Sequence, residues 1–319
     1  MRVTPFRIPA LLFLTISAFA QPPATQPKTQ TPQDLTLKTG SNPPAREGNS
    51  AVNTDPPALK PEPKLSDNEM EVFLRTANVV AQKKLASGTT GSTRVTLSDG
   101  KLTHDAQFQP IDIYKPVFRG AEGTVEKNFR DSYKFNIAAF RLGRMMSINN
   151  IPMSIERELD GKMGSMTWWL DNIWMTEAER RDRGIKPPAS QFWVDELNTV
   201  RVFDQLIYNT DRNQGNLLIT PDWKVWMIDH TRAFRTLVAL QKKNALPGRI
   251  DHKVLRALRQ MNTLQLKKEL GAYLRPEEIS AILGRRDLIV AHFDREISTK
   301  GEDLVLTGMP RKTPEVSLP

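Results

Sequence analysis

The residues with the clearest chemical potential lie between Asn209 and Phe234, in the stretch NTDRNQGNLLITPDWKVWMIDHTRAF. Asp211 follows a segment with the pattern of a buried helix, Asn216 precedes the short apolar run LLI, and Asp229 ends a second run, VWMI. The Pro-Asp step between the two runs is typical of a turn, so the runs predict a β-hairpin. Because a hairpin brings its two outer ends together, we expect Asn216 and Asp229 to converge, with Asp211 beside them.

Two oxygen ligands next to a carboxylate suit Mg²⁺, or Mn²⁺, bound to the phosphates of a nucleotide, because Mg²⁺ prefers oxygen donors and completes its shell with water and phosphate oxygens. Phosphoryl transfer then needs a residue that orients the acceptor hydroxyl. We therefore predict Asn216 and Asp229 as metal ligands and Asp211 as the catalytic residue. Asp and Asn are also common turn formers, but the flanking strands and the second aspartate favour a functional site.

Composition excludes several other classes of site. The chain has no cysteine, which excludes disulfide scaffolds, cysteine nucleophiles and thiolate zinc sites. It has no HExxH motif and no GxxxxGK[ST] motif, so a zinc protease and a P-loop nucleotide site are unsupported. The net charge is +9, but the clusters RRDRG and GRRD alternate basic with acidic residues and lack aromatic neighbours, so we expect no nucleic-acid partner.

The first 65 residues predict a segment for export followed by a linker. Residues 1–20 have the basic start, short apolar run and small residues of a secretory signal peptide, and the run is too short to span a bilayer. Residues 21–65 contain 10 of the 23 prolines and no aromatic residue, which predicts a disordered linker. We therefore expect an exported protein, periplasmic or extracellular, with no transmembrane anchor in the mature chain.

Residues 66–174 predict a small mixed lobe. A capping-box pattern at Ser66 begins a helix that is expected to continue to about Gly88. Strand patterns follow and predict a small antiparallel sheet, then a helix, then two further strands. These elements are expected at Arg94–Leu97, Ala106–Phe118, Ser132–Met146, Ile151–Arg157 and Ser165–Leu170.

Residues 175–308 predict a mainly helical lobe, and residues 309–319 a flexible tail. A buried helix is expected over Ser190–Tyr208, followed by the hairpin. Further helices are expected at His252–Met261, Leu264–Leu274 and Pro276–Ile297. The order of elements predicts an α+β fold.

The stretch around Asp211 resembles the catalytic and metal loops of the atypical branch of the protein-kinase-like superfamily. These families include phosphatidylinositol 3- and 4-kinases, HipA-type kinases and secretory-pathway kinases of the Golgi casein kinase type, in which a D-R-x-x-x-N-like loop is followed by a strand ending in I-D or L-D. The resemblance implies a two-lobed kinase-like fold that binds ATP, or another nucleoside triphosphate, with Mg²⁺ or Mn²⁺. It implies transfer of the γ-phosphoryl group to a hydroxyl of a protein Ser or Thr, a glycan or a lipid headgroup.

The resemblance extends upstream. IYKPVFRG resembles the strand that carries the nucleotide-binding lysine, which implies Lys115. The run NIAAFRL resembles helix C, where the family pattern has glutamate and this chain has Asn136, a residue that we also expect to contact the cofactor. Asparagine cannot neutralise an ammonium group. Either a neighbouring acid such as Glu122 or Glu126 substitutes, or phosphoryl transfer is slow or absent.

Two further cofactor contacts are expected. The segment SGTTGST offers Gly88 and Gly91 as a loop that covers phosphates, although a flexible connector explains it equally well. Trp169 and Leu170 fall where a hinge between lobes would contact adenine, with core packing as the alternative for at least one tryptophan. The rival function is a catalytically inactive binding or scaffold module of the same fold, and a third is an interaction protein tethered to the cell wall.

Overall fold

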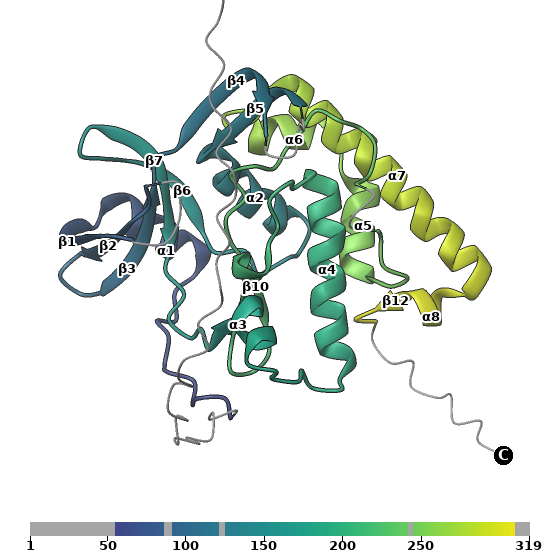
Figure 1. Ribbon diagram of the computed structural model, residues 1–319, viewed down its shortest axis with the longest axis horizontal. Coiled ribbons are helices and arrows are strands. Elements are labelled where there is room, and N and C mark those ends of the chain that lie inside the picture. Colours follow the sequence, from purple (N-terminus) through teal and green to yellow (C-terminus); the bar gives the residue numbers. More distant parts are fainter. Residues whose placement is uncertain (1–54, 86–90, 121–124, 242–244, 310–319) are drawn as a thin grey trace, which may run out of the picture. The chain divides into compact units, whose positions relative to one another are not determined.

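The structure is a computed structural model that describes residues 55–85, 91–120, 125–241 and 245–309, which belong to one compact unit (Figure 1). The predicted signal peptide, most of the predicted linker, Gly88, Glu122 and residues 310–319 lie outside the described residues. Among the described helices, none combines the length and the apolar composition that crossing a bilayer requires.

The first half of the compact unit is built on a five-stranded antiparallel sheet in the order β1-β2-β3-β7-β6. The strands are β1 (Asn78–Lys84), β2 (Thr93–Ser98), β3 (Thr103–Gln109), β6 (Ser154–Leu159) and β7 (Lys162–Trp168). Helices α1 (Asp67–Thr76) and α2 (Lys134–Met145) both contact β6 and β7. Alternating apolar side chains on β2 and β3 are buried, as the period of a half-buried strand requires.

The prediction that the first helix runs to Gly88 is wrong. Ser66 and Glu69 form the expected capping box, but the helix ends at Thr76, and Ala77 already has extended backbone angles. Residues 78–84 instead form β1, which pairs with β2. The adjacent β-branched residues Val79 and Val80 favour a strand, and pairing with β2 outweighs the helical spacing of the apolar residues.

The sequence predicted that residues 106–118 belong to one small sheet, and this prediction is wrong. β3 ends at Gln109, and Pro110, which has no N–H to donate, follows it. β4 (Asp112–Arg119) then pairs with β5 (Val125–Ser132) in a separate two-stranded sheet. The side chains of β4 are mostly exposed.

The end of the predicted linker is attached to the folded body. The backbone N–H of Lys60 donates to Asn172 Oδ1 (2.8 Å), and Asn172 Nδ2 donates to the carbonyl of Lys60 (2.9 Å) and to Glu62 (2.7 Å). Residues 60–62 therefore do not belong to a free linker, because their polar groups are paired with one side chain.

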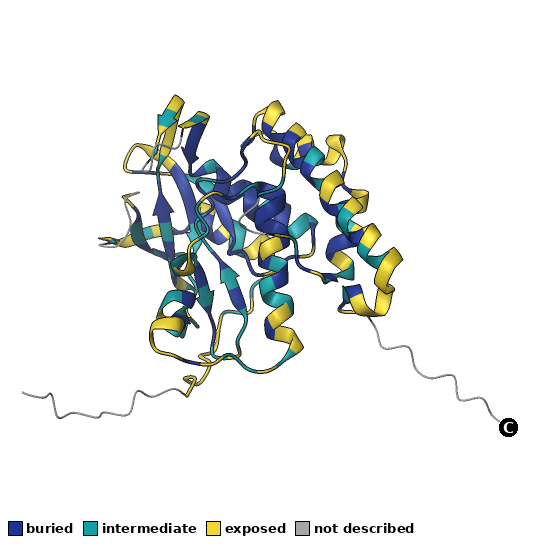
Figure 2. Ribbon diagram, turned by 45° about the vertical axis from the view of Figure 1, so that its right-hand side comes forward, coloured by how far each residue is buried: buried dark blue, intermediate teal, exposed yellow. Residues whose placement is uncertain are grey.

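The second half of the unit is mainly helical, as predicted. A three-stranded sheet in the order β10-β9-β8 contains the predicted hairpin. The elements are β8 (Met175–Thr176), α3 (Glu177–Asp182), α4 (Gln191–Ile207), the 3₁₀ turn η2 (Gln214–Asn216), β9 (Leu217–Ile219), β10 (Val225–Met227), β11 (Ile250–Asp251), α5 (His252–Gln260), α6 (Thr263–Leu270), α7 (Pro276–Lys300), α8 (Glu302–Val305) and β12 (Leu306–Thr307). Buried positions line the inner side of α7, whose outer side is exposed (Figure 2), and residues 202–207, in the second half of α4, are all buried.

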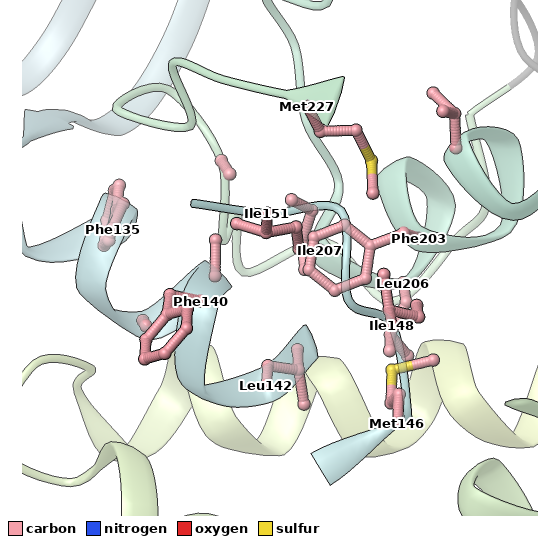
Figure 3. Packing of buried hydrophobic residues seen from close by; sticks show 14 of the residues in the cluster. Phe135, Phe140, Leu142, Met146, Ile148, Ile151, Phe203, Leu206, Ile207 and Met227 are labelled. Carbon is pink, nitrogen blue, oxygen red and sulfur yellow. The ribbon is translucent and has the colours of Figure 1, made fainter. Parts of the chain in front are cut away.

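A shared hydrophobic cluster joins α2 to the helical half. Figure 3 shows side chains of α2, of the segment that follows it, of α4 and of β10 packed together. Phe135, Leu142, Ile151, Phe203 and Met227 are each no more than 2% exposed. Since a buried cluster of this kind resists displacement, it fixes α2 relative to the end of the hairpin.

Candidate active site

The segment that carries Asp211 begins directly after α4. Tyr208 ends the helix in the left-handed conformation (φ 48°). Asn209 then accepts a hydrogen bond from the backbone N–H of Asp211 (3.0 Å), and its own amide donates to Asp204 (3.1 Å). The backbone of Asp211 is therefore held in a turn, while its carboxylate remains 44% exposed. This arrangement leaves the carboxylate accessible to an acceptor molecule.

Arg212 holds this segment to the hairpin. Its guanidinium forms an ion pair with Asp204 (2.9 Å) in which both side chains are almost completely buried. It also donates to the carbonyl oxygens of Asn216 (3.0 Å) and Ile228 (2.6 Å). The sequence patterns did not single out Arg212, although its place directly after Asp211 in the D-R-x-x-x-N-like loop was a usable signal.

Asn216 and Asp229 lie at the same end of the hairpin, which confirms the predicted convergence. Leu217 pairs with Met227, and the N–H of Ile228 donates to the carbonyl of Asn216 (3.1 Å), so the next residue on the second strand is Asp229. The Asn216 amide donates to the carbonyl of Asp211 (3.2 Å). Its Oδ1 is therefore the atom that Asn216 can offer to a cation.

The environment of Asp229 suits a bound cation. The residue adopts a positive φ of 53°, which is uncommon outside glycine. Burial raises the pKa of its carboxyl group, hydrogen bonds from Thr231 lower it, and the charges of Asp131 and Asp211 raise it further. Within the described parts of the chain, no three His, Cys, Asp or Glu side chains form a metal site by themselves. The Asp229 carboxylate and Asn216 Oδ1 are oxygen donors of the kind that Mg²⁺ prefers, and Mg²⁺ usually takes its remaining ligands from phosphates and water.

Asn136 on α2 is held by three hydrogen bonds. Its Nδ2 donates to Gln109 Oε1 (2.7 Å) and to Ser165 Oγ (3.3 Å), and its Oδ1 accepts from the backbone N–H of His230 (2.8 Å). Asn136 and Gln109 are 9% and 3% exposed. The amide thus links α2 and the sheet to the residue after Asp229. Its side-chain polar atoms are engaged by these contacts, and the residue lines the cavity beside Asp229.

Gln109, and not Lys115, is the residue that contacts Asn136 on α2. Gln109 ends a strand of the five-stranded sheet and faces α2, whereas Lys115 lies on exposed β4 with its ammonium 5.2 Å from the Phe118 ring centroid. The segment IYKP resembles a strand that carries a nucleotide-binding lysine, but it lies on β4, which pairs with β5 and is not part of the five-stranded sheet. The side-chain contact between the end of β3 and α2 is therefore a pair of neutral amides.

Of the two acids suggested as substitutes for the missing glutamate, the one that the structure describes is paired with an arginine. Glu126 lies on β5 and forms an ion pair with Arg235 (2.5 Å), and Glu122 lies outside the described residues. Asp131, at the other end of β5, is one of the two acids whose charges raise the pKa of Asp229, together with Asp211. It is 2% exposed, and its Oδ2 accepts from Arg232 Nε (2.8 Å).

The other expected cofactor residues lie outside the cavity next to Asp229. Gly91 belongs to the connection between β1 and β2 and has a positive φ of 66°, and an added Cβ there would touch nothing. Trp169 and Leu170 lie in the connection from β7 to β8, where the Arg94 guanidinium is 4.3 Å from the Trp169 ring centroid. Both residues line a neighbouring cavity that shares Ile151 and Pro152 with the one at Asp229.

The cavity beside Asp229 is small. Its walls include Asn136 and Thr167 on one side and Met227 and Ile228 on the other, and its volume is about 20 Å³. This is room for about one water molecule. This cavity is therefore too small to hold a nucleotide.

No family model matches the chain, and no curated protein matches its sequence. Solved structures of similar fold include the following two. A structure of hydra Fam20 with sugar has a TM-score of 0.54 and 17% identity, covering 75% of this chain and 91% of that one. A crystal structure of the Golgi casein kinase has a TM-score of 0.53 and 14% identity, covering 75% and 77%. At these identities the likeness establishes the fold, which is the two-lobed, protein-kinase-like α+β fold that the sequence predicted.

Proposed function

We propose that this protein is an exported kinase-like phosphotransferase that uses Mg-ATP, or another Mg-nucleoside triphosphate, to phosphorylate a hydroxyl group. The observation that carries the proposal is the convergence of Asp211, Asn216 and Asp229 at one end of the β9–β10 hairpin. The export part of the proposal rests on the signal-peptide pattern of residues 1–20.

Asp211 binds the acceptor hydroxyl because its carboxylate is the exposed one. The half-exposed carboxylate of Asp211 accepts the hydrogen bond of the acceptor hydroxyl and turns its oxygen toward the γ-phosphorus. The acceptor oxygen bonds to the γ-phosphorus, the bond to the β–γ bridging oxygen breaks, and the nucleoside diphosphate leaves with that oxygen. Asp211 takes the hydroxyl proton.

Asn216 Oδ1 and the Asp229 carboxylate would hold the metal ion. Magnesium, when bound, neutralises part of the negative charge of the phosphates. Arg212 positions both ligands, because it donates to the carbonyl oxygen of Asn216 itself and to that of Ile228, which precedes Asp229. The acceptor classes to test are a protein Ser or Thr, a glycan and a lipid headgroup, and the sugar in the hydra Fam20 structure supports including a glycan.

The second candidate is a kinase-fold binding or scaffold module without turnover. The amide pair of Gln109 and Asn136 favours it, because neither residue carries a charge that can bind a phosphate or neutralise a lysine. The small cavity beside Asp229 favours it further. Low ATP levels outside the cytoplasm would also suit a protein that does not consume a nucleotide.

The test compares the purified mature chain with its Asp211→Ala variant. Mg-ATP turnover is measured with casein, an oligosaccharide and phosphoinositide vesicles as acceptors, and Mg-ATP binding is measured by titration calorimetry. We expect Asp211→Ala to abolish turnover and preserve binding, and Asp182→Ala, at an exposed position on α3, to change neither. Equal turnover in wild type and Asp211→Ala would refute the proposal, and tight binding without turnover in the wild type would favour the scaffold.

A further inference from the structure

Arg232 lies among the carboxylates of the site. Its Nε donates to Asp131 Oδ2 (2.8 Å), and its Nη1 is 3.6 Å from Asp211 Oδ2. Burial lowers the pKa of Arg232, but the hydrogen bond to Asp131 and the charges of Asp131, Asp211 and Asp229 together raise it above its usual range. The guanidinium is thus a permanent cation next to both the catalytic residue and a predicted metal ligand.

A nucleotide triphosphate in this site would need a protein cation, because Mg²⁺ neutralises only part of its charge. The residues at the usual lysine and glutamate positions, Gln109 and Asn136, are neutral. Arg212 and Arg235 are each 7% exposed at the side chain and are bonded to carboxylates and backbone carbonyls. Arg232 is 36% exposed.

The bonding of Arg232 leaves part of its guanidinium available. Asp131 engages Nε, and the contact of Nη1 with Asp211 is longer than a hydrogen bond. The terminal nitrogens of arginine form a fork that matches two oxygens of a phosphate group. The backbone is fixed as well, since Thr210 Oγ1 donates to the carbonyl of Arg232 (2.9 Å). The fork is therefore anchored from the Nε side and from the backbone.

We propose that Arg232 binds the phosphate groups of the nucleotide in place of the strand lysine that this chain lacks, and that Asp131 positions its guanidinium. The proposal rests on the proposed function. It makes Arg232 the residue that distinguishes a nucleoside triphosphate from the nucleoside. The carboxylate of Asp131 is 3% exposed at the side chain, so it acts on the phosphates through Arg232.

The test measures ligand selectivity in the mature chain by titration calorimetry with ATP and with adenosine, both in the presence of Mg²⁺. We expect Arg232→Gln to weaken ATP binding by about 10- to 100-fold, the range for losing hydrogen bonds to a charged group, and to leave adenosine binding unchanged. Arg232→Lys should recover part of the loss, and Asp131→Asn should cause a smaller loss. The exposed residue Arg256 provides the matched control, Arg256→Gln.

The possible outcomes are distinguishable. If the wild type binds ATP and Arg232→Gln binds it equally well, the role of Arg232 is refuted and the proposed function stands. If Arg232→Gln weakens ATP and adenosine to the same extent, the residue is structural and the inference is also refuted. If the wild type binds neither ligand, both the inference and the proposed nucleotide chemistry fail.

Discussion

Replacing Gln109 by Lys and Asn136 by Glu together would convert the buried amide pair into an ion pair of the kind found in active kinases. The two single variants, Gln109→Lys and Asn136→Glu, each introduce one charge. The two side chains are 3% and 9% exposed and joined by a 2.7 Å hydrogen bond. Each single variant places a charge against a neutral amide. A buried charge without a partner costs about 3–5 kcal/mol of unfolding free energy.

The double variant should recover a large part of this loss, because the two new charges can pair. The backbone N–H of His230, which now donates to Asn136, can donate to the new carboxylate instead. We expect the two substitutions to be coupled by at least about 2 kcal/mol, within the range observed for residues in contact.

The assay is urea unfolding of the wild type, both single variants and the double variant, supported by thermal melts. For a domain of this size, each 1 kcal/mol corresponds to about 2–4 °C in Tm. The control is Gln82→Lys on exposed β1, which should change stability by less than about 0.5 kcal/mol. Additive effects of the two substitutions, or single variants as stable as the wild type, would refute the interpretation of Gln109 and Asn136 as the replaced ion pair.

Two further predictions concern the hairpin end. Arg212→Met should lower the unfolding free energy by about 3–5 kcal/mol in urea, since it leaves Asp204 buried without its partner; a loss below about 1 kcal/mol would contradict this. Because the folded-state pKa of Asp229 is raised above its unfolded value, its ionised form destabilises the fold at pH 7, and the cost is relieved as pH falls through the folded pKa. Asp229→Asn should therefore raise Tm at pH 7 and make the rise in Tm on acidification smaller than in the wild type. The variant should also lose any stabilisation by Mg²⁺. A lower Tm for the variant than for the wild type at pH 7 in metal-free buffer would contradict this prediction.

The hairpin and its polar ends could be predicted because they depend on neighbouring residues. The Pro-Asp turn and the two apolar runs determine which residues end up together, so Asn216 and Asp229 converge with few long-range contacts. The capping box at Ser66 and the helices of the second half could be predicted for the same reason, because they also depend on residues that are close in the sequence. Arg212 was within reach of the motif but had no role until its bonds to Asn216 and Ile228 were known.

The sequence by itself determined the α+β class and the convergence of the two hairpin ends, because helical periodicity, turns and caps act over a few residues. Only the tertiary structure decided which strand faces α2. Strand pairing is non-local: β3 pairs with β7, about 60 residues away, and this pairing brings Gln109 to Asn136 and leaves Lys115 on a separate ribbon. The position of Arg232 between Asp131 and Asp211 likewise depends on the packing of β5 against the segments that flank the hairpin, which no local pattern specifies.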